Sequence, residues 1–266
     1  MEVISAAELK LTFILCCLVA SCSTFACSPV EENALAALEL DVAATLKEQG
    51  NSAVVDFGFL PSQCKSWPQK AGFAILAKPY LYESRENGER YFGMAIAVAN
   101  EKTGTVLSKI NEKKLMFVDA IEPSDVSIDT ANYRFKSNEP AFGVRTARRN
   151  YSDAAPVREV LMDMYIPSGD RIRRVAGPIV MSSYNGEGGG GCEFSGTEKT
   201  VSISILGSKT NSYFDMHAAI KQARIKYVKN ESECEKTVGS TSTAGYNLKF
   251  NGLSYEIPRA LQGDVN

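Results

Sequence analysis

Apolar residues recur at helical spacing near the start of the chain and at alternate positions over most of its remaining length. Between Asn33 and Lys47 they are separated by three or four residues, which gives a helix one apolar face. These residues are Leu35, Leu38, Val42 and Leu46. Gly50 follows as a helix stop signal, and from Gly72 onward the period changes to two. The pattern predicts one N-terminal helix followed by many strands.

The first two strands form a predicted hairpin. Phe73–Glu83 and Tyr91–Ala99 are apolar runs rich in aromatic and branched residues, and the segment between them contains the turn dipeptide Asn87-Gly88. Pro79 lacks the N–H that a central strand donates, so we expect its strand to lie at an edge or to carry a bulge. Residues 51–72 are expected to be a connector.

Further short strands are predicted at hairpin spacing, at residues 105–110, 115–120, 132–136, 142–148, 160–166, 172–182 and 201–206. Phe214–Val228 fits a helix or a strand, and we favour a strand. Near the end, alternation on both sides of Asn251-Gly252 predicts a two-residue type I′ hairpin in which Leu253 faces the core. The predicted fold class is mainly β, an antiparallel sandwich or barrel-like sheet with one N-terminal helix after a signal segment.

The N-terminal segment predicts export. An apolar run from Leu11 to Ala20 is about half the length of a membrane-spanning helix, which is typical of a signal peptide. It leads into Val19-Ala20-Ser21-Cys22, which resembles the lipobox of bacterial lipoprotein precursors. The resemblance implies cleavage before Cys22, lipidation of its thiol and a membrane anchor; conventional cleavage after Ala26 is the alternative.

The resulting organisation has four parts. Residues 1–21 are the signal peptide, 22–71 the anchor, helix and connector, 72–258 a β-rich domain and 259–266 a tail. A second boundary could fall at 137–140. The protein is expected on the periplasmic face of a bacterial membrane, or soluble in the periplasm or secreted if no lipid is attached.

Four cysteines remain once the leader and Cys22 are set aside: Cys27, Cys64, Cys192 and Cys234. An oxidising compartment favours disulfides between them. Three pairings are open, and we favour Cys27 with Cys64 and Cys192 with Cys234. Zinc binding is disfavoured because the chain has no CxxC pair and only one histidine. No metal or other cofactor is therefore expected.

The chain is close to neutral, with 29 basic and 31 acidic residues, which gives no reason to expect nucleic-acid binding. Arginines nevertheless gather in two neighbouring segments: Arg145, Arg148, Arg149, Arg158, Arg171, Arg173 and Arg174. If the sheet brings them together, they form a docking patch for an anionic glycan or an envelope protein. Otherwise they form a solvated surface interleaved with Asp153, Glu159, Asp163 and Asp170.

Catalytic motifs are weak. His217 is the single histidine, and no serine has a GxSxG context around it. Gly186–Gly191 matches GxGxxG but leads to a strand and not to a helix, so it is interpreted as a loop. The acidic residues between Asp119 and Asp129 have no EF-hand spacing. No catalytic residue is assigned.

Three functions are compatible with this sequence. The first is a non-catalytic envelope lipoprotein that binds another envelope component. The second is a secreted hydrolase that uses carboxylates, which a deep pocket with two facing acids of raised pKa would favour. The third is a secreted inhibitor or immunity-type protein.

Overall fold

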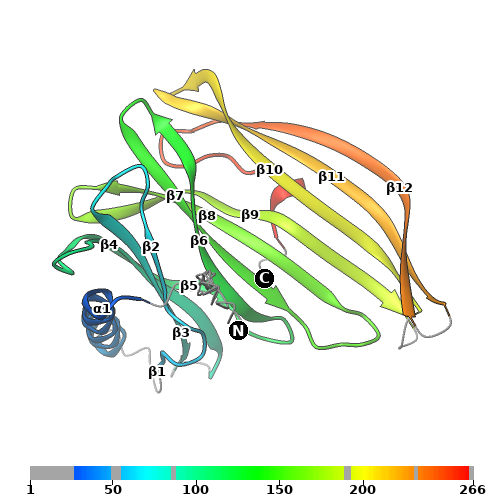
Figure 1. Ribbon diagram of the computed structural model, residues 1–266, viewed down its shortest axis with the longest axis horizontal. Helices are drawn as coiled ribbons and strands as arrows, with labels where there is room; N and C mark the ends of the chain where they lie inside the picture. Colours follow the sequence, from blue (N-terminus) through cyan, green and yellow to red (C-terminus); the bar gives the residue numbers. More distant parts are fainter. Residues whose placement is uncertain (1–26, 49–54, 85–87, 189–192, 231–232, 264–266) are drawn as a thin grey trace, which may run out of the picture.

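The computed structural model describes residues 27–48, 55–84, 88–188, 193–230 and 233–263. Helix α1 (Pro29–Glu48) is followed by twelve strands in one sheet, and a 3-10 turn, η1 (Arg259–Leu261), lies near the C-terminus (Figure 1). The strands are β1 (Val55–Asp56), β2 (Gln63–Ser66), β3 (Phe73–Glu83), β4 (Arg90–Asn100), β5 (Val106–Phe117), β6 (Glu122–Lys136), β7 (Glu139–Arg149), β8 (Val157–Ser168), β9 (Arg171–Gly188), β10 (Phe194–Thr210), β11 (Tyr213–Asn230) and β12 (Glu233–Leu248). The mainly-β prediction is confirmed.

The β3–β4 hairpin is buried on both faces, which explains its nearly continuous apolar sequence. One face carries alanines on which the leucine and valine stripe of α1 packs; they are Ala74, Ala95, Ala97 and Ala99. The other face, with Ile75 and Ile96, packs against Phe142 and Tyr165 of the larger part of the sheet. The hairpin is therefore the middle layer between the helix and the long strands.

Pro79 lies inside β3 without a bulge, opposite Met94 of β4. On its other edge, β3 pairs with β2 at residues 74–77 and with β1 at residues 81–82. The proline thus falls in the gap between two short edge strands, where its missing N–H breaks no ladder. The same pairing corrects the connector prediction, because parts of residues 51–72 join the sheet.

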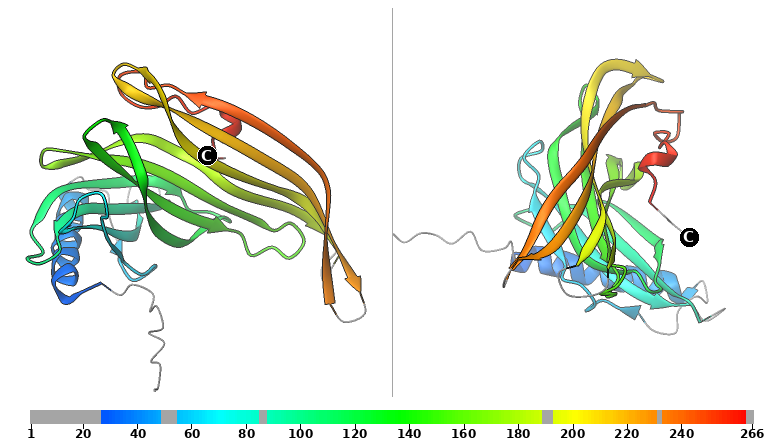
Figure 2. Two further views of the ribbon diagram at one scale, coloured as in Figure 1. Left: turned by 45° about the horizontal axis from the view of Figure 1, so that its top comes forward. Right: turned by 90° about the vertical axis from the view of Figure 1, so that its right-hand side faces the viewer.

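The long strands β6 to β12 form an antiparallel meander that curves as it runs away from the α1 end (Figure 2). β9 holds the two parts of the sheet together, since it pairs with β8 and β10 and, in a single parallel bridge, with β5 through Arg171 and Lys109. β11 confirms the strand interpretation of Phe214–Val228.

The C-terminal segment covers part of the core of the long strands through Phe250, Tyr255 and Leu261. The predicted two-residue hairpin is wrong here. Phe250 bridges to Tyr255 across a four-residue loop, and Leu253 is 79% exposed. Asn251 explains the longer loop, because its side-chain oxygen accepts hydrogen bonds from the backbone N–H groups of Leu253 and Ser254.

The disulfide Cys27–Cys64 is present, as predicted, and ties the start of α1 to β2. Cys234 is also disulfide-bonded, and Cys192, its predicted partner, lies outside the described residues, as does Cys22. Among the described helices, none is both long and apolar enough to cross a membrane.

Candidate anion-binding cavity

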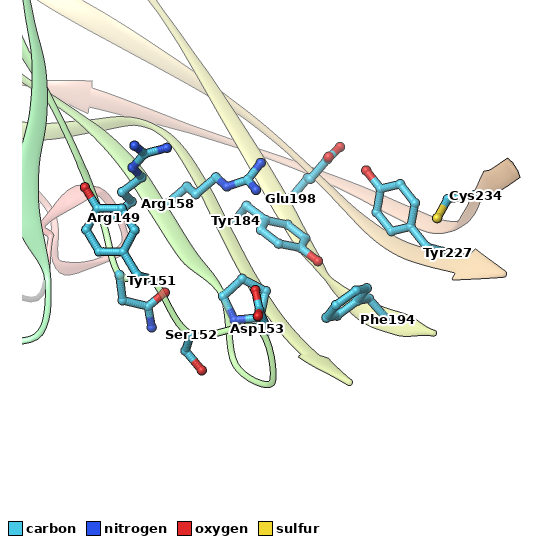
Figure 3. Close-up of a pocket in the computed structure, with 12 residues that line it drawn as sticks. Arg149, Tyr151, Ser152, Asp153, Arg158, Tyr184, Phe194, Glu198, Tyr227 and Cys234 are labelled. Carbon is cyan, nitrogen blue, oxygen red and sulfur yellow. The ribbon is translucent and has the colours of Figure 1, made fainter. Parts of the chain in front are cut away.

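A cavity of about 770 Å³ lies on the long strands, at the end of the molecule remote from α1 (Figure 3). Its lining comes from the β7–β8 connection and from the six successive strands β7 to β12. The charged and aromatic side chains at its centre are Arg149, Arg158, Tyr184, Phe194, Glu198 and Tyr227. We call this the arginine–tyrosine cavity.

Four of these side chains form one row across the sheet. Arg149 is directly opposite Arg158, Arg158 is opposite Tyr184, and Tyr184 is opposite Glu198. Directly opposed residues on neighbouring strands project from the same face and lie about 5 Å apart. Strand register therefore assembles the row from four separate stretches of sequence.

The row occupies the face of the sheet opposite to the one that the C-terminal segment covers. Lys199, the neighbour of Glu198, donates a hydrogen bond to the carbonyl of Ala260 at 3.2 Å. Arg148 and Glu159, the neighbours of Arg149 and Arg158, form a buried ion pair at 2.5 Å. Because adjacent residues of a strand point to opposite faces, the cavity residues remain on the uncovered side.

Two glycines make room for the ring of Tyr184. A Cβ atom at Gly186 would lie 2.8 Å from Cζ of this ring, and one at Gly196 would lie 3.0 Å from its Cε2. Both distances are shorter than van der Waals contact, so the ring rests against backbone that has no side chains. The tyrosine consequently lies along the sheet and presents a flat aromatic surface to the cavity.

Phe194 and Tyr227 extend this surface. They are directly opposite each other on β10 and β11, and Phe194 rests against a third glycine, Gly188. A second cavity, of about 370 Å³, shares these two rings, but its lining also includes Glu187, Ser195 and Lys226, which form a row on the opposite face of the sheet. It lies at the end of the strands and does not lengthen the arginine–tyrosine cavity.

The Tyr184 hydroxyl is a neutral group at physiological pH. Burial raises the pKa of Tyr184, and the nearby Tyr227 raises it further. Arg158 lowers the pKa and Glu198 raises it, both to a smaller extent. Tyr184 can therefore stack against a ligand and donate a hydrogen bond, but it adds no negative charge.

The two arginines have no carboxylate partner among the described residues. The guanidinium group of Arg149 lies 4.9 Å from the ring of Tyr151, and Arg158 has no ion pair with any described side chain. Glu198 is neutralised by Lys236 of β12, whose Nζ is 2.6 Å away. The remaining carboxylate of the lining, Asp153, forms no ion pair with either arginine. Positive charge is thus left uncompensated beside the aromatic surface.

The other arginines of the predicted patch lie elsewhere. Arg145 pairs with Asp129 at 2.6 Å, and Arg174 pairs with Glu112 and Asp163. The remaining ones are Arg148, buried against Glu159; Arg173, which donates to the Tyr213 hydroxyl; and Arg171, which lines a separate cavity of about 520 Å³ beside α1. Of the seven, only Arg149 and Arg158 line the arginine–tyrosine cavity.

The aromatic residues of the cavity were not singled out from the sequence. A tyrosine two positions before a glycine on a strand was the available signal, because the two residues share a face and the glycine leaves room for the ring. The sequence interpretation placed Gly186 and Gly188 in a loop, whereas both belong to β9; residues 189–192 lie outside the described residues.

A second ionisable cluster lies at the junction of β5, β8 and β9. Burial raises the pKa of Asp163 to about 7; Arg174 opposes this effect and Glu112 adds to it. The Asp163 side chain is only 10% exposed and lies against Gly177, where an added Cβ would overlap its carboxylate. It lines neither the arginine–tyrosine cavity nor the two smaller cavities.

His217 and the acidic segment 119–129 have ordinary structural roles. The His217 ring bonds to the Asn247 side chain at 2.7 Å. Asp129 accepts hydrogen bonds from Tyr133 and Arg145. No group of three or more metal-ligating side chains occurs within the described ranges.

The chain matches no family model, no curated protein and no solved structure in the comparisons made. The cavity is therefore interpreted from its own chemistry.

Proposed function

We propose that this chain is a non-catalytic binding protein of the bacterial envelope, tethered to a membrane through Cys22, and that the arginine–tyrosine cavity binds an anionic glycan. One observation carries the ligand assignment. Arg149 and Arg158 are directly opposed on neighbouring strands, and neither has a carboxylate partner in the part of the chain that the structure describes; like charges in that position destabilise a sheet. A bridging anion removes the repulsion.

Guanidinium groups and flat rings together select the ligand class. An arginine can donate two parallel hydrogen bonds to a carboxylate, phosphate or sulfate group. The apolar face of a sugar ring can pack on an aromatic ring, as provided by Tyr184, Phe194 and Tyr227. The row extends from β7 to β10, three strand spacings or about 14 Å, and Tyr227 on β11 continues the lining beyond it, so the surface is longer than one sugar. A short stretch of an acidic polysaccharide fits this surface.

The hydrolase interpretation has less support. Glu198 faces the cavity, but it is held in an ion pair with Lys236. Asp163 has the raised pKa expected of a general acid, yet it is enclosed at the sheet junction and lines none of the described cavities. Glu112, the acid nearby, is ion-paired with the same Arg174 guanidinium as Asp163, so no second acid among the described residues faces Asp163 across an open space.

Calorimetric titration with a defined probe tests the binding proposal. The probe is a hexamer of galacturonate, and a neutral hexamer of glucose is its control. Each charge-assisted hydrogen bond contributes about 1.5 kcal/mol or more, so the double variant Arg149→Gln/Arg158→Gln is expected to weaken galacturonate binding by about 100-fold. Arg224→Gln is the matched control, since Arg224 is exposed on β11 and points to the opposite face.

Equal affinity for the neutral and the acidic hexamer would refute the anionic assignment, as would an unchanged affinity in the double variant. The tether is tested separately. Cys22→Ser is expected to move the protein from the membrane fraction to the soluble fraction, and membrane association that survives this substitution would rule out the lipid anchor.

A further inference from the structure

The edges of the sheet are protected unequally. β1 and β2 are two and four residues long, and β6 has Pro123, several charged side chains and three register shifts against β7. Short strands, prolines, charges and bulges are the devices that keep sheet edges from pairing with other chains. β12, the edge strand at the other end of the sheet, has fewer of them.

β12 is 16 residues long, and among the strands that the structure describes it pairs only with β11. Its N-terminal half carries Glu233, Glu235 and Lys236, and a bulge at Gly239–Ser240 separates this half from the rest. The segment Thr241–Asn247 after the bulge has no charge and no proline, and it is exposed at nearly every position. We call Thr241–Asn247 the open edge.

We propose that the open edge pairs antiparallel with the open edge of a second copy of this chain, which joins two sheets across a two-fold axis at Ala244. The sequence is self-complementary in this register. Ala244 faces itself, Thr243 faces Gly245, and Ser242 faces Tyr246, so each larger side chain is opposite a smaller one.

Charge also favours a second copy in this orientation. In the antiparallel register, the acidic residues Glu233 and Glu235 lie beyond the paired segment, at opposite ends of the interface, so they do not face each other. In a parallel arrangement each would lie beside its own equivalent, and like charges would repel. The antiparallel arrangement therefore satisfies the free backbone groups without opposing any charges.

Two oppositely charged substitutions of Ala244, the residue on the two-fold axis, test the proposal. The full chain is expected to sediment as a dimer, and Ala244→Lys is expected to weaken self-association by about tenfold or more because two ammonium groups would face each other. Ala244→Glu is expected to have the same effect. An equimolar mixture of the two variants is expected to recover the dimer, since the opposed charges then attract.

Ala219→Lys is the control, because Ala219 is exposed on the neighbouring strand β11 and does not belong to the edge. It is expected to remain dimeric. A wild-type chain that is monomeric would overturn the proposal. This outcome covers the case in which the open edge binds an extended segment of another protein and not a second copy of this chain. A wild-type dimer that Ala244→Lys leaves intact, or a mixture of the two charged variants that stays monomeric, would overturn it as well.

Discussion

Replacing Asp163 with asparagine is expected to change how stability depends on pH. The carboxyl group lies on β8, is 10% exposed, and is 3.3 Å from the guanidinium group of Arg174, which also contacts Glu112 at 3.5 Å. The ring of Tyr165 is buried close by. Burial is the main reason that the pKa of Asp163 rises to about 7, above the ordinary value of 3.8. The folded state therefore binds a proton more tightly at this position than the unfolded chain does.

The direction and size of the effect depend on this difference in proton binding. Between pH 4 and pH 7 the folded state holds a proton that the unfolded state has lost, so the free energy of unfolding falls as the pH rises. A difference of about three pH units corresponds to about 4 kcal/mol. Above pH 7 this contribution is constant. Asparagine has the same shape as aspartate and does not ionise, so the free energy of unfolding of Asp163→Asn does not fall in this way between pH 4 and pH 7.

Urea unfolding of both proteins at several pH values between 4 and 8 measures the effect. The stability of Asp163→Asn relative to wild type is expected to increase by up to about 4 kcal/mol across this range. Asp170→Asn, at the exposed β8–β9 turn, controls for the loss of a carboxylate. If the wild-type and Asp163→Asn curves run parallel, burial does not control the ionisation of Asp163 and the reasoning fails.

Two further predictions concern packing. Gly186→Val is expected to push the ring of Tyr184 off the sheet, which should lower the free energy of unfolding in urea by about 1–3 kcal/mol and weaken galacturonate binding. Gly207→Val is the control: no atom lies within 4 Å of the added Cβ, so stability and binding are expected to stay unchanged. Arg148→Met is expected to lower stability by about 3–5 kcal/mol because it leaves the buried Glu159 unpaired. The double variant Arg148→Met/Glu159→Met should regain most of this loss, and a double variant as unstable as the single one would contradict the explanation.

Much of the fold could be predicted because local pattern encodes it. The apolar face of α1 could be read from residues that are three or four positions apart in the sequence. The β3–β4 hairpin could be read from two apolar runs joined by a turn signal. The strands of residues 51–72 could not be predicted, since their pairing depends on β3 having a free edge on either side of Pro79. The C-terminal loop was predicted wrongly because the Asn-Gly signal marks a turn but does not fix its length.

The cavity was much harder to predict than the fold. Its row of side chains depends on the register of four strands, and a shift of one residue would send Arg158 or Tyr184 to the opposite face. The arginine patch was predicted from the spacing of charges along the sequence. In the folded sheet, Arg145 and Arg174 are ion-paired with carboxylates, and only two of the seven arginines line the cavity.

The two parts of the proposed function constrain each other through the shape of the molecule. Cys27, which the disulfide fixes to β2, is five positions after Cys22, so a lipid on Cys22 would hold the α1 end within about 17 Å of the membrane surface. The cavity lies at the far ends of β9 and β10, and a strand of 18 residues such as β9 is about 59 Å long. A tethered molecule would therefore present the cavity away from its own membrane when it stands upright. This arrangement favours a glycan that extends into the envelope over a headgroup of the anchoring bilayer.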